Sequence, residues 1–400
     1  MRPTLTPCSR AAEPPADVTH AAGRWDLIVV GAGPAGSAAA IAALRARPSA
    51  RVLLLDRAPL GRDKVCGDGI APHAVAELST LDVDAVRADE HVSDVRLVGP
   101  GGGDAGALTA SPGYVVPRRI FDERLARAAI SAGAGFAVEK VTTVTHDDEL
   151  VTVNGAWQAP IVIGADGSNS AVRRAIGQPA NHGRSLAVAL RGYAPTPPGQ
   201  PRELTIRWDS QRAGGLCYAW AFPTAGGTTN VGYGMSAAAP EHSRARLVQR
   251  LHELLPEYDL DSVELHGHTL PLTVARPLPA VGRVLLVGDA ASLINPFTGE
   301  GIYSAIASGA MAGAAAMGDA AASVYSKQLA QRFSRQHRQT TALYRIIDYP
   351  IVLDTVIRAA RADSRLFDRL LDVGLGDASF SLADLARFGR YVRAPRRRVE

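Results

Sequence analysis

The sequence predicts an α/β protein in which one parallel sheet is assembled from two distant stretches of chain. Three observations carry this prediction. A glycine-rich turn at residues 31–36 separates a short apolar run from an Ala-rich run, and a second glycine-containing loop, residues 288–302, follows another apolar run far downstream. Between them, from about residue 186, alternating runs separated by Gly-rich turns are typical of antiparallel strands.

The first unit is predicted to be a strand, a tight turn and a helix. The apolar run 25–30 ends at Gly31, and the Ala-rich run 37–47 is stopped by Pro48. Small side chains let such a helix lie close to the sheet and direct its N-terminal amides at a pyrophosphate. The turn has the features of a dinucleotide-binding loop, made of Gly31, Gly33, Pro34, Ala35 and Gly36.

An acidic residue completes this unit. A second apolar run, 51–55, is closed by Asp56, which lies twenty residues after Gly36. At this spacing an acidic side chain meets an adenosine ribose, so we expect Asp56, with the neighbouring Arg57, to bind a cofactor. The glycine pattern alone allows NAD as well as FAD, because both carry the same ADP half.

A second match to the glycine pattern, residues 101–106, lacks this context. It follows a plausible strand, 95–98, but leads into residues 108–113, which contain Ser-Pro-Gly and cannot open a helix. We expect a surface hairpin here rather than a second nucleotide site.

The remaining elements are expected in chain order. They are a helix over 118–129, a buried strand over 161–164, antiparallel strands over 203–208, 216–222 and 228–235, a helix over 242–258, a strand over 284–287 that returns to the first sheet, a helix over 301–317, and helical or irregular chain after 321.

The downstream loop decides between the two cofactors. Asp289 sits where a strand ends, so its carboxylate can bind a ribityl or ribose hydroxyl. Small residues let the backbone reach the edge of a flat ring, and a helix beginning near Gly301 directs its positive end at the flavin, where negative charge grows on reduction. We therefore expect FAD, held at this end by Gly288, Asp289, Pro296, Gly299, Gly301 and Ile302.

These features define the expected domains. They are a disordered leader, 1–24; a discontinuous Rossmann-like FAD-binding domain, 25–90, 114–185 and 276–320; an antiparallel β-sheet substrate domain, 91–113 and 186–275; and a helical C-terminal region, 321–400.

Four sequence blocks together resemble the geranylgeranyl reductase family of FAD-dependent oxidoreductases, within the p-hydroxybenzoate hydroxylase-like flavoprotein superfamily. The blocks are the first glycine loop, Lys-Val-Cys-Gly-Asp-Gly at 64–69, Tyr-Ala-Trp-Ala-Phe-Pro at 218–223, and the loop 288–302. The resemblance implies an enzyme that reduces a carbon–carbon double bond of a small hydrophobic substrate, an isoprenoid or an isoprenoid-derived natural product.

The resemblance also implies cofactor contacts. Arg118 matches an arginine that such proteins use on the FAD pyrophosphate, and Asp166 lies in a shared cofactor motif. Lys64 and Gly67 belong to the block that is expected to lie beside the flavin.

Cys66 and three aromatic residues are the catalytic candidates. Cys66 matches a cysteine that lies near the flavin in reductases of this family, and nearby basic side chains, Arg62 and Lys64, could favour a thiolate. A small buried Cys used for packing is the alternative. Two-residue spacing on a strand projects Tyr218, Trp220 and Phe222 to one side as an aromatic wall for the substrate, or as packing between the domains.

Composition excludes several other classes. The formal charge of +4 is supplied by the tail alone, which has five arginines against one glutamate between residues 390 and 400, so we expect no nucleic-acid surface. Three dispersed cysteines form neither a disulfide framework nor a metal site and fit the cytoplasm. We expect no transmembrane segment, and any membrane association would be peripheral.

Two alternatives stay open at this point. A flavin monooxygenase that hydroxylates or epoxidises a natural product would use the same fold and loops, and a non-catalytic flavin-binding protein would keep the ADP-binding loop. Because no second dinucleotide domain is visible, electrons would come from transiently bound NAD(P)H, or from a ferredoxin or external reductase. Residues His73, His182, His266 and His268 have no partner that the sequence identifies and are expected to be structural or exposed.

Overall fold

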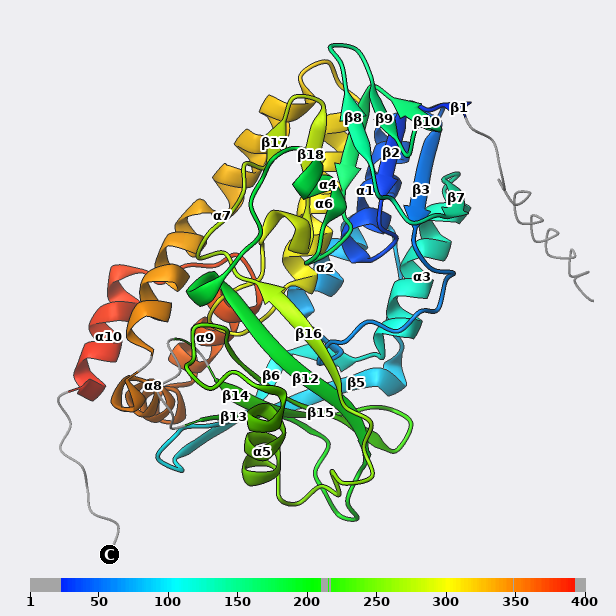
Figure 1. Cartoon of the computed structure of the whole chain (residues 1–400). Helices are drawn as coiled ribbons and strands as arrows, with labels where there is room; N and C mark the ends of the chain where they lie inside the picture. Colours follow the sequence, from blue (N-terminus) through cyan, green and yellow to red (C-terminus); the bar gives the residue numbers. More distant parts are fainter. Residues whose placement is uncertain (1–22, 210–214, 216, 348, 393–400) are drawn as a thin grey trace, which may run out of the picture.

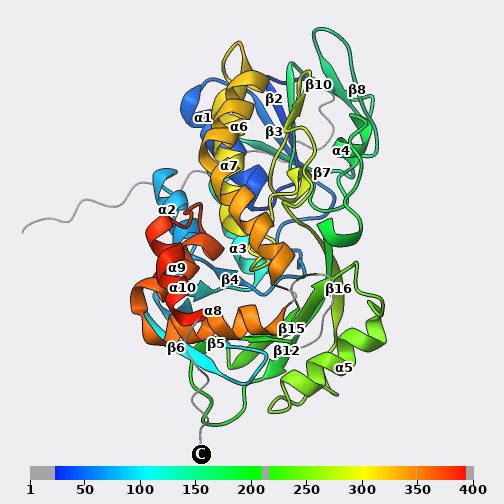
Figure 2. The same ribbon diagram turned by 90° about the vertical axis from the view of Figure 1, so that its left-hand side faces the viewer.

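In the computed structural model the described residues are 23–209, 215, 217–347 and 349–392. Nearly all of the predicted leader, and the last eight residues of the Arg-rich tail, lie outside this range. The cofactor half and the substrate half occupy opposite ends of the molecule, and the C-terminal helices gather beside the substrate half (Figures 1 and 2).

A six-stranded sheet forms the cofactor half. Its order is β17 (Ala280–Val281), β18 (Val284–Leu286), β11 (Ile161–Gly164), β2 (Leu27–Val30), β3 (Val52–Asp56) and β7 (Gly135–Val138). All neighbours pair in parallel except β17 and β18. Strand β11 lies between β2 and β18, so the chain does return to its first sheet, as the sequence predicts.

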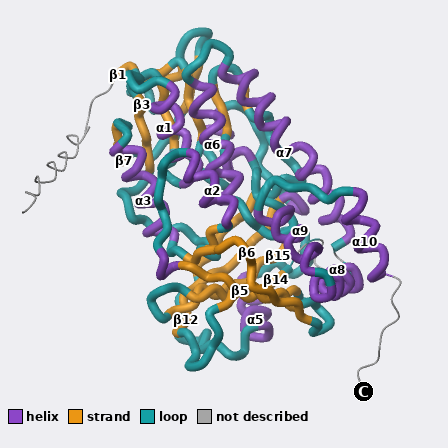
Figure 3. Tube along the Cα trace, turned by 180° about the vertical axis from the view of Figure 1, so that it is seen from behind, coloured by secondary structure: helices purple, strands orange, loops and turns teal. Residues whose placement is uncertain are grey.

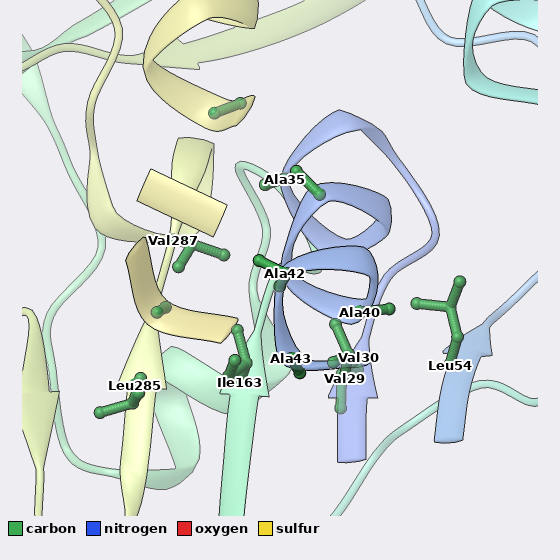
Figure 4. Packing of buried hydrophobic residues seen from close by; sticks show 14 of the residues in the cluster. Val29, Val30, Ala35, Ala40, Ala42, Ala43, Leu54, Ile163, Leu285 and Val287 are labelled. Atoms are coloured by element: carbon green, nitrogen blue, oxygen red, sulfur yellow. The ribbon is translucent and has the colours of Figure 1, made fainter. Parts of the chain in front are cut away.

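Four helices flank this sheet. They are α1 (Pro34–Ala46), α3 (Arg118–Ser131), α6 (Ile302–Ala316) and α7 (Ala321–Ile346). Figure 3 shows α1 and α6 side by side, and Figure 4 shows alanines of α1 packed among apolar side chains of the sheet, with Ala40 facing Leu54 of β3. A Cβ at Gly309 or Gly313 of α6 would lie 2.1 Å from the Ala35 oxygen or 2.0 Å from the Ala39 oxygen. Glycine at these two positions therefore permits the close contact of the helices.

An eight-stranded sheet forms the substrate half. Its order is β16 (His266–Pro271), β12 (Leu186–Pro195), β15 (Thr228–Ser236), β14 (Tyr218–Pro223), β13 (Glu203–Trp208), β5 (His91–Val98), β6 (Asp104–Val115) and β4 (Gly69–Ile70). Neighbours are antiparallel except β13 and β5. Strands β5 and β6 form the predicted hairpin around residues 99–103. Helix α5 (Arg244–Leu254) packs on the outer face.

The strands support the proposed domain boundaries with one exception. All strands of the six-stranded sheet come from segments that the sequence assigned to the FAD-binding domain. Seven strands of the larger sheet come from segments assigned to the substrate domain, although the last two residues of β6 lie beyond that boundary. Strand β4, which the sequence placed with the cofactor segments, pairs with β6 of the larger sheet. The division itself stays a proposal.

Smaller elements complete the described chain. A four-stranded sheet contains β1 (Gly23–Arg24), β10 (Trp157–Ala159), β9 (Val151–Val153) and β8 (Val144–His146). The remaining helices are α2 (Pro72–Thr80), α4 (Ala171–Ala175), α8 (Pro350–Ala362), α9 (Ser364–Leu375) and α10 (Leu382–Val392).

The C-terminal helices share a core with the larger sheet. Leu97 of β5 and Trp208 of β13 belong to the same buried cluster as Leu353 and Ile357 of α8 and Phe367 of α9. The C-terminal region is helical, as predicted, and its helices α8 and α9 pack on the larger sheet as part of the substrate half. None of the helices in the described part is long and apolar enough to span a membrane.

Candidate functional site

A cavity of about 530 Å³ runs between the two halves of the molecule. At one end it is lined by Pro34 at the start of α1, and by Asp289 and Gly301 at the downstream loop. At the other end it reaches Val356 and Ile357 of α8. In open α/β sheets, ligands bind outside the carboxyl ends of the parallel strands, where the first end of this cavity lies.

The first glycine loop can make its tight turn against the sheet only because it lacks side chains at two positions. Gly31 has φ 107°, and a Cβ there would lie 2.3 Å from the oxygen of Ala165. A Cβ at Gly36 would lie 1.8 Å from the Gly31 oxygen. Helix α1 begins after Gly33 without a side-chain cap, so its first amides remain available to an anion. This loop fits the pyrophosphate of FAD.

Asp56 lies at the predicted place, at the end of β3. Its buried carboxylate accepts hydrogen bonds from the Ala32 amide at 2.8 Å and from Arg62 at 3.0 and 3.1 Å. A ribose would therefore share this acid with Arg62. Arg57, the other predicted residue here, is exposed and does not line the cavity.

Lys64 and Asp289 meet at the cavity, although 225 positions separate them. The Lys64 Nζ lies 2.8 Å from an Asp289 oxygen. Burial raises the pKa of Asp289, but the Lys64 ammonium outweighs this effect and the pKa lies below its ordinary value. The ion pair joins the two loops that are expected to hold the flavin.

His268 of β16 lies beside this ion pair. It lines the cavity, and burial together with the Lys64 charge lowers its pKa to about 4. Its Nε2 lies 3.4 Å from the Ser168 hydroxyl. The sequence treated His268 as structural or exposed, because nothing local connects β16 with the loops that surround it.

The start of α6 presents a neutral acid to the cavity. Glu300 accepts a hydrogen bond from the Tyr303 amide at 2.6 Å, and burial raises its pKa to about 8. Pro296, Gly299, Gly301 and Ile302 line the same stretch. The sequence placed these four residues at the flavin but did not select Glu300, although its position before the helix was a usable signal.

A polar network from the larger sheet holds the loop that carries Cys66. Arg191 Nε and Asn230 Nδ2 donate to the Cys66 backbone oxygen at 3.2 and 2.9 Å. Asn230 also donates at 2.8 Å to Asp68, which has φ 62° and accepts a hydrogen bond from the Tyr193 hydroxyl. Burial raises the pKa of Asp68 to about 6. The network fixes the backbone of Cys66 from the substrate side.

The cations expected to favour a Cys66 thiolate are engaged elsewhere. Arg62 binds Asp56, and Lys64 binds Asp289. The basic group that interacts with the Cys66 thiol is Arg118, which is buried and also pairs with Asp122 at 2.6 and 2.8 Å. Arg118 and Cys66 both line the cavity.

The three aromatic residues of β14 all line the cavity. Tyr218 donates to the Thr298 oxygen at 2.5 Å, and Trp220 Nε1 donates to Asn230 at 2.8 Å. A Cβ at Gly67 would lie 3.2 Å from the Phe222 ring. The wall therefore touches both the downstream loop and the Cys66 loop.

Asp166 lies in the turn that follows β11. Its carboxylate accepts hydrogen bonds from the Ala171 amide at 2.6 Å and the Ser170 hydroxyl at 2.5 Å, at the start of α4. It does not line the cavity. In this structure Asp166 organises the turn after β11 and helix α4.

The sequence missed the part of the site that lies farthest from the glycine loops. His73 of α2 lines the cavity, and its Nε2 lies 3.4 Å from Asp372 of α9. Leu353, Val356 and Ile357 of α8 form the distal wall. An apolar periodicity after residue 350 was the available signal, but it does not say which surface such a helix covers.

The chain is similar to known proteins over most of its length. The chain matches the family model described as lycopene cyclase protein over residues 26–395. It is 33% identical over 317 residues to a menaquinone reductase of Mycolicibacterium smegmatis, covering 72% of this chain and 75% of that protein. It is 31% identical over 336 residues to digeranylgeranylglycerophospholipid reductase 1 of Methanopyrus kandleri, covering 79% and 88%.

The fold also matches a solved structure. A geranylgeranyl bacteriochlorophyll reductase-like protein from Thermoplasma acidophilum superimposes with a TM-score of 0.75 at 24% identity, covering 92% of this chain and 96% of that one. Fold and loops define a Rossmann-type flavoprotein oxidoreductase that uses FAD. Within this class, the chain belongs to the geranylgeranyl reductase family of FAD-dependent enzymes.

Proposed function

We propose that this protein reduces a carbon–carbon double bond in an isoprenoid or an isoprenoid-derived compound. The observation that carries the proposal is the cavity, which continues from the two flavin loops to helix α8. A soluble aromatic substrate would need only the end beside the flavin. A long apolar chain explains why the cavity extends so far along the sheet.

The distal part of the cavity suits an aliphatic chain. Its lining includes Val95 and Leu97 of β5, Ile206 of β13, and Leu353 and Ile357 of α8. Removing apolar surface from water contributes roughly 25 cal/mol per Å². Binding energy gained along the chain can therefore hold the reacting double bond at the proximal end.

The residues at the cofactor end of the cavity would have separate roles in binding FAD and in transferring a proton. Bound FAD, once reduced, would supply hydride to one carbon of the alkene. Gly299 and Gly301 would let backbone approach the ring, and the first amides of α1 would bind the pyrophosphate. Glu300, whose pKa is raised to about 8, holds a proton on its carboxyl at neutral pH and is the acid we assign to protonate the other carbon.

Cys66 would position the alkene rather than exchange electrons with it. Its backbone is fixed by Arg191 and Asn230, and its side chain lines the cavity between the flavin loops and β14. We expect Cys66→Ser to lower kcat about tenfold or more while FAD stays bound. Unchanged kcat in this variant would make the thiol a packing group.

Turnover with and without oxygen tests the proposal. The substrates are a prenylated quinone and a geranylgeranylated phospholipid, the classes that the relatives' names suggest. FAD-loaded protein is reduced with dithionite in the anaerobic reaction and with NAD(P)H in the reaction in air, because dithionite would consume the oxygen. We expect products that gain two hydrogen atoms and form equally well under anaerobic conditions. Products that gain oxygen, formed only in air, would establish the monooxygenase alternative instead.

The electron donor and the location belong to the same proposal. We propose NAD(P)H, or a donor protein such as a ferredoxin, as the source of electrons, and a cytoplasmic enzyme that touches membranes peripherally. Exposed Ile346 and Ile351, at 49% and 60%, flank the α7–α8 junction and support this contact. Helix α8 also lines the cavity, so an apolar substrate would have a short path into it.

A further inference from the structure

A second hollow, of about 610 Å³, lies on the other side of the downstream loop. One wall is helix α7, and the other is the segment 273–279 between β16 and β17. Ala291 and Leu293 form part of its lining, while the adjacent Ile294 lines the main cavity. The hollow, which we call the α7 cleft, is separate from the substrate site and has a different chemistry.

The α7 cleft is strongly basic. Arg276, Arg338 and Arg345 line it together with hydroxyl groups, and none of the residues that line it is an acid. Helix α7 carries five Lys or Arg residues and no Asp or Glu. Of these five, Arg332 alone forms ion pairs with acids in the described part of the chain, with Glu77 and Asp377. Among the described residues, no acid forms an ion pair with Arg276, Arg338 or Arg345, so their positive charge stays available in the cleft.

Arg276 is held in place by a buried histidine. Its Nη1 lies 2.6 Å from Nδ1 of His337, which is 4% exposed and stacks on Phe333 with ring centroids 5.4 Å apart. Burial, together with the Arg276 charge, lowers the pKa of His337 to about 3. The imidazole is therefore neutral at physiological pH, and its Nδ1 accepts a hydrogen bond from the guanidinium.

Thr273 also lines the cleft, and it is 4% exposed. Its hydroxyl has no hydrogen-bond partner among the described residues, but the oxygen is enclosed by protein and does not open to the cleft. The groups that a ligand in the cleft can reach are therefore the arginines and the half-buried Ser334 and Thr341.

We propose that the α7 cleft binds the phosphate group of a metabolite-sized molecule. Guanidinium groups match phosphate oxygens with paired hydrogen bonds, and Ser334 and Thr341 can donate to the remaining oxygens. The volume falls in the range of pockets that bind small molecules, so the phosphate would be attached to a larger group. This site does not depend on the reaction proposed for the main cavity.

Two sources could provide this phosphate chemistry. One is a soluble phosphate ester, such as the 2′-phosphate of a nicotinamide dinucleotide. The other is the headgroup of an anionic phospholipid, because Arg345 of the cleft is followed by the exposed Ile346. Both sources use the same arginines, and they are separated by experiment.

Calorimetric titration of the FAD-loaded protein tests the site without any turnover. The probes are inorganic diphosphate, NADP⁺, NAD⁺, and vesicles of phosphatidylcholine with or without phosphatidic acid. We expect diphosphate to bind, and Arg276→Gln or Arg338→Gln to weaken it about tenfold or more, since each removes one charge-assisted contact. The control, Lys327→Gln, makes the same charge change on an exposed position of α7 outside the cleft and should stay within about twofold.

The comparison of probes then identifies the source. NADP⁺ binding more tightly than NAD⁺, with dependence on Arg276, would assign the soluble ester. Arg276-dependent binding to phosphatidic acid vesicles, with equal and weak binding of the nucleotides, would assign the lipid headgroup.

Two results would overturn the proposal. One is an equal loss in Lys327→Gln and Arg276→Gln, which would indicate diffuse charge attraction. The other is wild-type binding of every probe by Arg276→Gln and Arg338→Gln, with unchanged near-UV circular dichroism to show that both are folded. His337→Phe keeps the stacking on Phe333 and should weaken diphosphate binding several-fold, because Arg276 loses its orientation.

Discussion

The contact between α1 and α6 gives the most direct test of the fold. In Gly313→Ala the new Cβ would lie 2.0 Å from the Ala39 backbone oxygen, whereas real Cβ atoms essentially never approach closer than 3.0 Å. The two helices would have to separate by about 1 Å, and neither contact atom can move by changing a rotamer. We expect a cost near the upper end of the overpacking range, about 3 kcal/mol, reduced by about 1 kcal/mol of helix propensity.

Gly389→Ala is the matched control. Gly389 lies in helix α10, and a Cβ there would meet nothing within 4 Å. This variant should gain up to about 1 kcal/mol from helix propensity, so the two substitutions should differ by about 3 kcal/mol in the free energy of unfolding. Urea denaturation followed by circular dichroism measures this difference, provided that the slopes of the transitions agree.

A third variant connects this packing with the cofactor. The Cβ of Gly309→Ala would lie 2.1 Å from the Ala35 oxygen, in the first turn of α1, which follows the glycine loop. We expect it to destabilise the fold about as much as Gly313→Ala but to weaken FAD retention more, as measured by release of flavin fluorescence. Equal stability of Gly313→Ala and Gly389→Ala would refute the reasoning, since it would show that the helices have room to spare.

Three further predictions concern the cavity. The pKa of Glu300 is raised to about 8 in the folded state, so the protonated carboxyl favours folding. The free energy of unfolding of the wild type should therefore fall relative to that of Glu300→Gln as the pH rises from about 4.5 to 8. Urea midpoints of the two proteins that run parallel over this range would contradict the prediction. Val356→Trp should fill the distal end of the cavity, and it should lower kcat/KM about tenfold for long isoprenoid chains but little for truncated ones. The control is Ala362→Trp, at an exposed position of α8, which should leave kcat/KM unchanged for both kinds of substrate. Asn230→Leu should lower kcat about tenfold while FAD stays bound, because the Cys66 oxygen loses a donor; loss of FAD instead would assign Asn230 to cofactor binding.

Local patterns were sufficient to predict the loops that lie at the carboxyl edge of the six-stranded sheet. The strand that ends at Gly31, the glycines at Gly33 and Gly36, and the acid at Asp289 are signals contained within a few residues, and the fold places each at the carboxyl edge of one sheet. The return of the strand at 284–287 to the first sheet was predicted as well, whereas the order of the strands within that sheet comes from the structure.

The partners of the charged residues could not be predicted in the same way. Arg62 binds Asp56 and Lys64 binds Asp289, so Arg118 is the cation at the Cys66 thiol. Which acid each of these cations contacts depends on the distances between segments that are far apart in the sequence. Asp166 is the opposite case, since its bonds to Ser170 and Ala171 are local and a capping signal explains them without a cofactor.

The C-terminal helices show why sequence motifs in the cofactor loops reveal only part of a binding site. The flavin requires small residues at fixed positions, which produces short and specific motifs. A wall that only has to be apolar, such as the α8 residues Leu353 and Ile357, can be made from many sequences and leaves no motif. Substrate choice within this family should therefore vary most where the sequence is least distinctive. Exchanging α8 between relatives should change which chain lengths are accepted while the flavin spectrum stays the same.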